Sequence, residues 1–320
     1  MDKMDKISII IPVYFNQDNL LPLYADLKTK VIDILTCDYE LIFVDDGSGD
    51  RSYEVMTQLA RIDTHIINIK LSRNFGEHAA ILAGLSRCTG TCAIRKAADL
   101  QDPSELILEM FARYKAGNKV VLAVREGRDE PLLQQFASNL YTVAMRKLAL
   151  PNMPKGGFDC FLIDRQLIDL LNDMEEKNTS LMAQILWSGF QTDNVYYQRQ
   201  KRQIGKSRWT FRKKVKLFMD SILGFSYFPI RFISGIGLCS FVGSMIWLVC
   251  VFIAKLTNRI TVEGYTTLIM LLLMTFGVTM LAMGILGEYL WRMFDATRNR
   301  PPFIIDEKTD DNQDKDRKIK

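Results

Sequence analysis

Cysteine and histidine are scarce in this sequence, and their spacing excludes the common metal motifs. The 320 residues include six cysteines and two histidines. Cys88 and Cys92 stand close together with His78 at some distance, but this spacing matches no zinc pattern. The other cysteines are scattered, and two of them lie in long apolar stretches. We expect all six to be reduced and structural.

The start of the sequence lacks the features of a secretory signal peptide. Residues 1–6 are charged, and the apolar run at residues 7–13 is too short for the apolar region and cleavage site of such a peptide. We therefore expect the N-terminal part of the chain to stay in the cytosol.

Charged residues are absent from two long stretches, residues 233–254 and 264–287. Each exceeds the roughly 20 residues that cross a bilayer, and residues 255–263 between them suffice only for a tight hairpin. A buried helical pair in a soluble protein is the alternative, but two such stretches in succession disfavour it. The sequence predicts a transmembrane hairpin at residues 230–292.

The distribution of basic residues predicts how this hairpin is oriented. Its loop carries Lys255 and Arg259 against Glu263, whereas basic residues are dense on both outer flanks. The positive-inside bias then places both termini and the N-terminal domain in the cytoplasm. The flanking basic residues are Arg199, Lys201, Arg202, Lys206, Arg208, Arg212, Lys213, Lys214 and Lys216 before the hairpin, and Arg292, Arg298 and Arg300 after it.

Short apolar stretches alternate with amphipathic ones in the first part of the chain. This alternation predicts a parallel sheet covered by helices on both faces. Ligands of such sheets bind beyond the carboxyl ends of the strands. The expected strands are residues 7–13, 39–44, 66–71, 92–96 and 119–124, and the expected helices are residues 18–35, 50–61, 77–87 and 103–116.

Four of the expected strands end in polar or turn-forming residues. Tyr14 offers a ring for stacking and Asp46 an acceptor for a base or ribose, while Gly47 and Gly76 permit close backbone approach. Each cluster alone is ordinary turn chemistry, but their joint place at one sheet edge favours a nucleotide site. The clusters are residues 12–14, 45–48, 72–76 and 97–102.

The last cluster is acidic and offers oxygen ligands from Asp99, Gln101 and Asp102. Mg2+ prefers oxygen and usually keeps one or two protein carboxylates, with substrate phosphates and water completing its shell. Asp102 fits equally well as the cap of a helix that starts at Pro103. The residues of this cluster, considered alone, fit either a metal and diphosphate site or a solvated loop.

Together the four clusters resemble family 2 glycosyltransferases, and most closely the polyprenyl-phosphate branch. This branch comprises dolichol-phosphate-mannose-synthase-like enzymes and includes bactoprenol glucosyl transferases with a C-terminal transmembrane hairpin. The resemblance covers residues 7 to about 295. It implies an α/β fold of the GT-A type, with a Rossmann-like nucleotide-sugar domain, and inverting transfer of one sugar to a polyprenyl phosphate. The matching segments are IIIPVY at 9–14, FVDDGSGD at 43–50, LSRNFG at 71–76 and ADLQDP at 98–103.

The resemblance also implies roles for residues that would bind the donor. The family pattern is Asp-Xaa-Asp at positions 97–99, whereas this chain has Ala97 and so lacks the first carboxylate. The expected donor residues are Pro12, Tyr14 and Asp46 for the nucleoside, and Asp99 and Gln101 for Mg2+ or Mn2+ on the diphosphate.

Residues 124–128, followed by Ser138, resemble the part of the family that receives the lipid phosphate. Guanidinium groups bind a phosphate bidentately, so Arg125 and Arg128 fit this task. Glutamines occupy residues 134–135, where the family often has a basic residue. The two arginines fit a solvated loop equally well when they are considered alone.

Two later segments resemble the parts that face the sugar and the leaving group. Asp159 matches the Asp that faces sugar and acceptor, and Asp164 is expected to cap the next helix. Residues 204–209 resemble a mobile loop in which Lys206, Ser207 and Arg208 would neutralise the diphosphate. The same loop also suits contact with anionic lipid headgroups.

An anionic lipid phosphate needs no general base, so the predicted mechanism depends on positioning and charge. The phosphate oxygen would attack the anomeric carbon in line as the nucleoside diphosphate leaves. The expected catalytic residues are Asp159 for orientation, Arg125 and Arg128 for the nucleophile, and Lys206 and Arg208 with the metal for the developing charge.

The predicted protein lies in the bacterial inner membrane, with a nucleotide sugar, a polyprenyl phosphate and lipid as partners and no nucleic acid. Its predicted parts are a cytosolic catalytic domain at residues 1–210, an interfacial amphipathic helix at 211–229, the hairpin and a cytosolic tail at 293–320, disordered from about 306. A linker helix packed on the catalytic domain is the alternative for 211–229. Gly235, Gly237, Gly243 and Ser244 are small enough for close helix contact in a homo-oligomer.

Two other functions remain open. A processive polysaccharide synthase would carry Gln-Xaa-Xaa-Arg-Trp, but Gly205 stands in the Gln position before Arg208 and Trp209, and more spans are needed. An inactive nucleotide-sugar-binding membrane protein is the second alternative, motivated by Ala97. Uridine as the base and glucose as the sugar are expected only from the resemblance.

Overall fold

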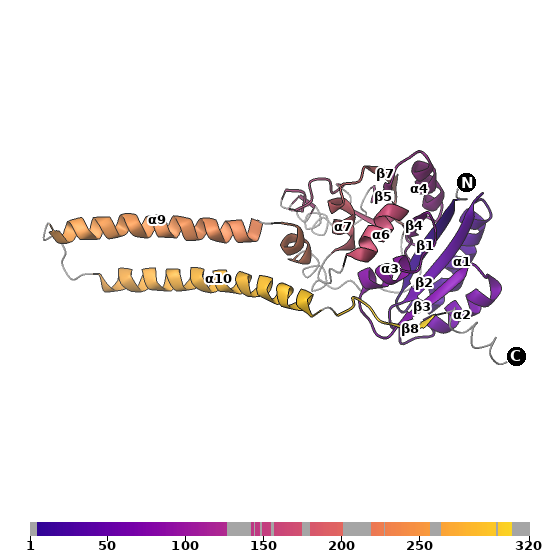
Figure 1. Ribbon diagram of the computed structural model, residues 1–320, viewed down its shortest axis with the longest axis horizontal. Coiled ribbons are helices and arrows are strands. Elements are labelled where there is room, and N and C mark those ends of the chain that lie inside the picture. Colours follow the sequence, from indigo (N-terminus) through magenta and orange to yellow (C-terminus); the bar gives the residue numbers. More distant parts are fainter. Residues whose placement is uncertain are drawn as a thin grey trace.

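The computed structural model shows an α/β domain from which two long helices project side by side (Figure 1). It describes residues 5–126, 142–143, 145–147, 149–154, 157–174, 180–200, 219–226, 228–256, 264–298 and 300–308. The two long helices are α9, Phe228–Leu256, and α10, Tyr265–Thr297.

The domain is built on an eight-stranded sheet with the strand order β7-β5-β6-β4-β1-β2-β3-β8. The first four strands pair in parallel, as the sequence predicts, whereas β6 runs antiparallel to both β4 and β5. The strands are β1 (Lys6–Val13), β2 (Asp38–Asp45), β3 (Ile66–Leu71), β4 (Cys92–Arg95), β5 (Val120–Arg125), β6 (Phe158–Asp164), β7 (Thr192–Tyr197) and β8 (Ile305–Lys308).

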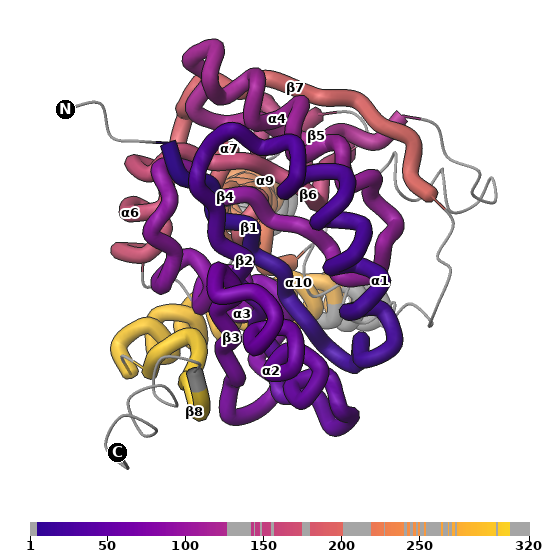
Figure 2. The backbone as a smooth tube through the Cα atoms, turned by 90° about the vertical axis from the view of Figure 1, so that its right-hand side faces the viewer, coloured from indigo at the N-terminus to yellow at the C-terminus, as the bar shows by residue number. Residues whose placement is uncertain are grey.

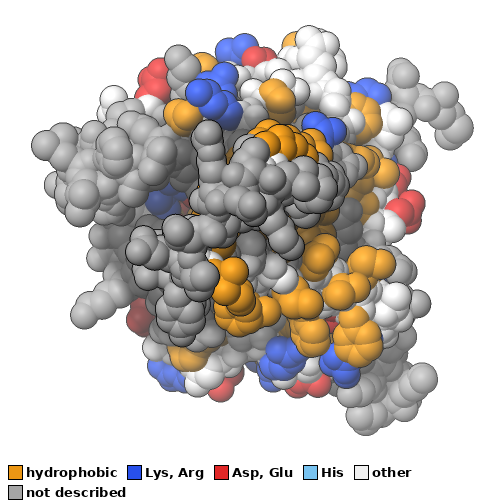
Figure 3. All heavy atoms as spheres, turned by 90° about the vertical axis from the view of Figure 1, so that its left-hand side faces the viewer, with side chains coloured by type: hydrophobic (Ala, Val, Ile, Leu, Met, Phe, Trp, Pro, Cys, Tyr) orange, Lys and Arg blue, Asp and Glu red, His pale blue; other side chains and the backbone are white. Residues whose placement is uncertain are grey.

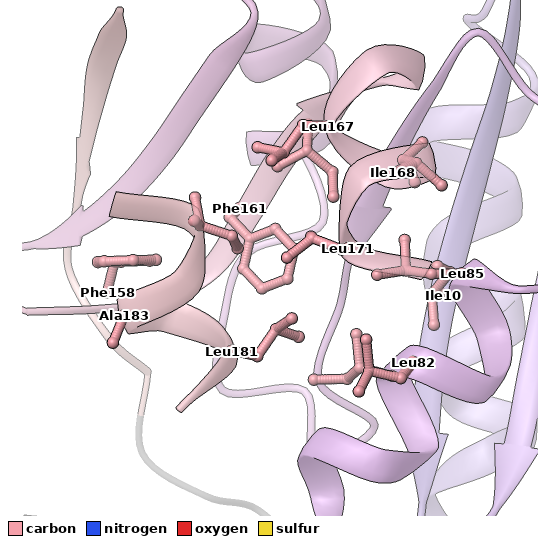
Figure 4. Packing of buried hydrophobic residues seen from close by; sticks show 14 of the residues in the cluster. Ile10, Leu82, Leu85, Phe158, Phe161, Leu167, Ile168, Leu171, Leu181 and Ala183 are labelled. Carbon is pink, nitrogen blue, oxygen red and sulfur yellow. The ribbon is translucent and has the colours of Figure 1, made fainter. Parts of the chain in front are cut away.

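Helices cover both faces of the sheet and bury two apolar clusters. Consecutive residues of β1 point to opposite faces, so Ile10 packs in one cluster and Ile9 in the other. The first cluster lies between the sheet and helices α3, α6 and α7, and it includes Phe161 and Leu171 (Figure 4). The helices are α1 (Gln17–Leu27) with a π-helical continuation (Lys28–Ile32), α2 (Ser52–Ile62), α3 (Glu77–Leu85), α4 (Leu106–Lys115), α6 (Arg165–Asp173) and α7 (Leu181–Trp187).

Strand β8 shows that the sheet of the N-terminal domain includes residues near the C-terminal end of the chain, beyond the predicted domain boundary. It follows α10 in the chain yet lies at the edge of the sheet beside β3 (Figure 2). The two strands pair antiparallel, with Lys70 opposite Glu307. Phe303 and Ile305 pack against the core, which explains why the strand forms. The prediction of a disordered tail from about 306 is therefore wrong for residues 306–308, and the catalytic sheet does not end at 210. Charged side chains are common on edge strands, so the composition of the tail was a poor guide.

The short helix Met219–Phe225 supports the alternative interpretation of the predicted interfacial segment. Ser221 is 1% exposed, and Ile222 belongs to the same cluster as α3, α6 and α7. Residues 221–225 of the predicted segment thus pack on the α/β domain, because Ile222 and Phe225 join its apolar core. Asp220 then joins α10 through an ion pair with Arg292 at 2.7 Å. Residues 211–218 lie outside the described part of the chain.

The two long helices expose large apolar side chains along their length, among them Leu238, Trp247 and Leu290. Figure 3 looks at the molecule from the hairpin side and shows hydrophobic side chains in orange on this face. Among the described residues, one helical segment, Met274–Thr297, is long and apolar enough to cross a membrane. A second span would require the bent pair Met219–Phe225 and Phe228–Cys239, which meet at 75°. The first of these two helices packs on the catalytic core. The prediction of two spans is therefore not confirmed.

Candidate functional site

The loops after β1 and β2 are joined at the carboxyl edge of the sheet. Pro12 lies opposite Val44 in the parallel pair, so Tyr14 and its neighbours emerge beside the end of β2. The backbone N–H of Phe15 donates to the Ser48 hydroxyl at 2.9 Å. The Tyr14 ring meets the Phe15 ring edge to face, with centroids 4.7 Å apart. These contacts fix the partly exposed Tyr14 at the edge where a nucleoside is expected.

Asp46 joins the loop after β2 to the loop after β3. Its carboxylate accepts hydrogen bonds from the Asn74 side chain at 2.9 Å and from the backbone N–H groups of Phe75 and Gly76 at 2.7 and 2.9 Å. Gly47 permits this approach, since a Cβ there would lie 2.5 Å from the Arg73 backbone. The side chain is 3% exposed, so its first task is to order residues 72–76.

The acidic loop after β4 presents Asp99 and Gln101 partly exposed. The Gln101 backbone N–H donates to Asp99 at 3.2 Å, and Leu100 between them has a positive φ of 57°. Gln200, which follows β7, donates its backbone N–H to the Gln101 carbonyl at 2.8 Å. The loop is thereby held between two parts of the sheet.

Asp99 and Gln101 supply hard oxygen donors of the kind that Mg2+ and Mn2+ accept. The part of the chain that the structure describes holds no group of three or more His, Cys, Asp or Glu side chains arranged to bind a metal. A cation at this loop would therefore need oxygen atoms from a ligand as well. This donor set fits a cation that arrives with a diphosphate.

Beneath this loop lie two buried cations, Arg95 and Lys96, which the sequence reasoning did not single out. Arg95 is 6% exposed and pairs with Glu77, and Lys96 is 1% exposed and donates to the Asp102 carbonyl. Burial lowers the pKa of Lys96. Burial also opposes ionisation of Asp102, but Arg95 and Lys96 together hold its pKa below the usual range. The sequence feature that could have indicated this buried pair is the presence of two basic residues at the end of an apolar strand.

The other half of the edge carries the predicted acceptor residues Arg125 and Asp159. Arg125 ends β5, Asp159 lies in the neighbouring β6, and the two side chains form an ion pair. Their side chains are 18% and 41% exposed, so Asp159 is the more open partner. Burial, followed by the nearby charge of Arg199, lowers the pKa of Arg125.

Tyr197 connects the two halves of the edge and was also missed from sequence. Its hydroxyl donates to Asp102 at 2.7 Å, and the residue lies directly opposite Arg125 in the parallel pair of β5 and β7. The sequence offered no signal for this role, because Tyr197 belongs to a strand for which no pattern was identified.

Of the remaining predicted residues, Asp164 is a confirmed helix cap, and the others lie outside the described part of the chain. Asp164 caps α6 by accepting the Gln166 backbone N–H at 2.9 Å, as predicted. The residues outside the described part of the chain are Arg128, Ser138, Lys206, Ser207 and Arg208.

A sheet with polar loops gathered at the carboxyl ends of parallel strands defines a nucleotide-binding class of α/β protein. The sequence model described as "Glycosyl transferase family 2" matches residues 8–172. The chain belongs to this family, and both the predicted glycosyltransferase class and the GT-A-type sheet are confirmed.

Three relatives align over nearly the whole chain. An uncharacterized glycosyltransferase, YkcC of Bacillus subtilis, is 34% identical and covers 95% of this chain and 94% of its own. The SfII prophage-derived bactoprenol glucosyl transferase of Shigella flexneri is 32% identical over 94% of this chain and 97% of its own length. The undecaprenyl-phosphate 4-deoxy-4-formamido-L-arabinose transferase of Photorhabdus laumondii is 32% identical over 98% of this chain and 98% of its own length.

Proposed function

We propose that this chain transfers one sugar from a nucleotide diphosphate sugar to a polyprenyl phosphate at a membrane surface. The observation that carries the proposal is the buried connection between the acidic loop and the acceptor arginine: Tyr197 donates to Asp102 and lies directly opposite Arg125 in the sheet. It brings a loop suited to a diphosphate next to a guanidinium suited to a second phosphate. The names of two relatives, which contain bactoprenol and undecaprenyl phosphate, support this acceptor class.

For the donor, we assign Pro12, Tyr14 and Asp46 to the nucleoside and Asp99 with Gln101 to a divalent cation. Mg2+ or Mn2+ bound there would neutralise charge that develops on the diphosphate. Asp46 acts by ordering residues 72–76, whose backbone would otherwise be free to move at the nucleoside. UDP-glucose is the first donor to test, because one aligned relative is called a glucosyl transferase.

For the acceptor, Arg125 presents a planar set of N–H donors that match two phosphate oxygens. We assign Arg128 and Ser138 to the same phosphate from the resemblance alone. The acceptor phosphate is already ionised at neutral pH, so no residue must remove a proton from it. Asp159 pairs with Arg125 and orients either the arginine or the sugar.

The transfer step forms a bond from the acceptor phosphate oxygen to the anomeric carbon and breaks the bond to the nucleoside diphosphate, with inversion. Lys206, Ser207 and Arg208 neutralise the departing diphosphate in this proposal. Removal of charge at the leaving group lowers the barrier without any change in the nucleophile.

The helical hairpin provides the membrane attachment in this proposal. Exposed side chains such as Leu238 and Leu268, each more than 60% exposed, suit a lipid environment better than water. We propose that both helices span the bacterial cytoplasmic membrane with both termini in the cytoplasm, so that the catalytic edge meets the inner surface. Close helix contact at Gly235 and Gly237 would support a homo-oligomer.

The test is incubation of purified protein with radiolabelled UDP-glucose, undecaprenyl phosphate and Mg2+. A lipid product that carries a single sugar supports the proposal. A polymer would indicate a processive synthase, and nucleotide binding without product an inactive binding protein. Replacement of UDP-glucose by a panel of other nucleotide sugars identifies the donor.

A further inference from the structure

Tyr197 is the last residue of β7 and is nearly buried, with 5% of its surface exposed. It lies directly opposite Arg125 in the parallel pair of β5 and β7, and its carbonyl accepts the Glu126 backbone N–H at 2.7 Å. The backbone register therefore fixes the phenol ring beside the end of β5. A tyrosine on this neighbouring strand has little freedom to move away from Arg125.

The hydroxyl of Tyr197 has one hydrogen to donate and two lone pairs that can accept. The hydrogen goes to Asp102 at 2.7 Å, so the lone pairs remain available to accept from the guanidinium of Arg125, which lies opposite Tyr197 on β5. Asp102 is 2% exposed and is surrounded by the charges of Arg95 and Lys96. This carboxylate is consequently an immobile acceptor, and it fixes the direction of the hydroxyl.

Arg125 is thereby held from two sides. Asp159 pairs with its guanidinium from β6, and Tyr197 lies directly beside it on β7. A guanidinium has five N–H donors in one plane, so two fixed contacts determine where the remaining donors point. An arginine with only one such contact would rotate about its side-chain bonds and lose this orientation.

We propose that Tyr197 is a positioning residue for the acceptor: its hydroxyl, fixed by Asp102, orients Arg125 toward the phosphate that accepts the sugar. This inference rests on the proposed function. It predicts a larger effect on the acceptor than on the donor, because the acidic loop keeps a second anchor, the backbone bond from Gln200 to Gln101, when the Tyr197 hydroxyl is removed.

The kinetic test compares Tyr197→Phe with Tyr196→Phe, a control at the adjacent position, which is 57% exposed. We expect Tyr197→Phe to raise KM for undecaprenyl phosphate about tenfold, the equivalent of about 1.4 kcal/mol, and to change KM for UDP-glucose less than about twofold. The control should match the wild type. Combination with Arg125→Lys should give less than the product of the two single effects, because both changes remove one interaction. Equal changes in both KM values, or multiplicative effects, would overturn the proposal.

A second measurement does not depend on sugar transfer. Phenylglyoxal modifies exposed guanidinium groups, and mass spectrometry can compare its rate at Arg125 with that at Arg113, which has a 47% exposed side chain. Tyr197→Phe should increase the rate at Arg125 severalfold relative to Arg113. An unchanged rate at Arg125 would contradict the positioning role. This measurement can be made even if the wild type transfers no sugar, and that absence of transfer would refute only the proposed function. Should Tyr197→Phe fail to fold, Asp102→Asn provides the same comparison with the tyrosine retained.

Discussion

The carboxylate of Asp46 accepts the backbone N–H of Gly76 at 2.9 Å, although the two residues belong to different strand–loop units of the sheet. With the bond from Phe75, this contact makes an acidic side chain the organiser of a neighbouring loop. A residue expected to touch the nucleoside therefore also shapes the surface that would hold it.

Asp46→Asn should weaken nucleotide binding and lower stability together. The amide retains one oxygen but replaces the other with a donor that faces N–H groups, so at least one charge-assisted bond is lost. We expect a loss of about 1–3 kcal/mol in the free energy of unfolding and a severalfold weaker Kd for UDP. Urea unfolding and calorimetry measure the two effects. Asp18→Asn, at an exposed position, is the control, and equal results for both variants would disprove the role of Asp46.

Asp99→Asn should reduce transfer by about 100-fold or more, because the loop loses its exposed carboxylate for a cation. Glu109→Gln removes an exposed charge on α4 and should leave the rate unchanged. Initial rates at several Mg2+ concentrations provide the measurement. A wild-type rate in Asp99→Asn would refute the assignment of this loop to the metal.

Ala97→Asp should reduce the Mg2+ concentration needed for half-maximal transfer, since it adds the carboxylate that the family pattern contains. Ala97 is 7% exposed and precedes the exposed part of the loop. Ala97→Asn adds a side chain of similar size without the charge and serves as the matched control. If the metal dependence is the same in both variants and the wild type, position 97 is dispensable for the metal.

Glu40→Gln should lower stability at neutral pH without any effect on substrate binding. Glu40 is 2% exposed and accepts bonds from Ser8 and from the Thr89 backbone, both at 2.6 Å, and pairs with Lys6. Burial opposes its ionisation, but these partners hold its pKa below the ordinary value. The stabilisation is therefore fully present above the pKa of the unfolded chain, about 4.3, and disappears as the pH falls through the lower folded value.

The measurement is urea unfolding of the wild type and Glu40→Gln between pH 7 and pH 3. We expect a difference of about 2 kcal/mol at pH 7, which shrinks below about pH 4. A difference that stays constant over this range would show that the charge of Glu40 contributes nothing.

Removal of residues 304–320 should weaken nucleotide binding, whereas removal of residues 309–320 should not. The longer deletion eliminates β8 and the Ile304 carbonyl, which accepts the Ser72 backbone N–H at 3.0 Å. Ser72 begins the loop that Asp46 orders, so the loop loses one of its anchors. Calorimetric titration with UDP compares the two truncations, and identical Kd values would contradict this role of β8.

The sequence allowed the first half of the sheet to be predicted, because buried parallel strands are continuous apolar runs. Observed β1, β2 and β3 lie within one residue of their predicted limits. No pattern predicted β6 and β7, and β8 was taken for part of the tail. Its pairing with β3 depends on a contact between residues far apart in the chain, which no local periodicity encodes.

The candidate site was predictable residue by residue but not as a network. Asp46 and Arg125 were identified from their place at strand ends or from the family resemblance. The buried ionic group of Arg95, Lys96 and Asp102 could not be inferred, because a buried cation is acceptable only when the fold supplies a counter-charge. That counter-charge comes partly from Glu77, on another element.

The hairpin is attached to the sheet at both of its ends. The chain enters α9 after the helix Met219–Phe225, which packs against the core, and it leaves α10 toward β8, which is part of the sheet. A rod attached at one point can swing, whereas attachment at two separate points removes most of that freedom. The two attachments therefore restrict how far the catalytic edge can move relative to the apolar helices. Such an enzyme would select its acceptor by the position of the phosphate relative to the bilayer and would be indifferent to the length of the lipid chain beyond it.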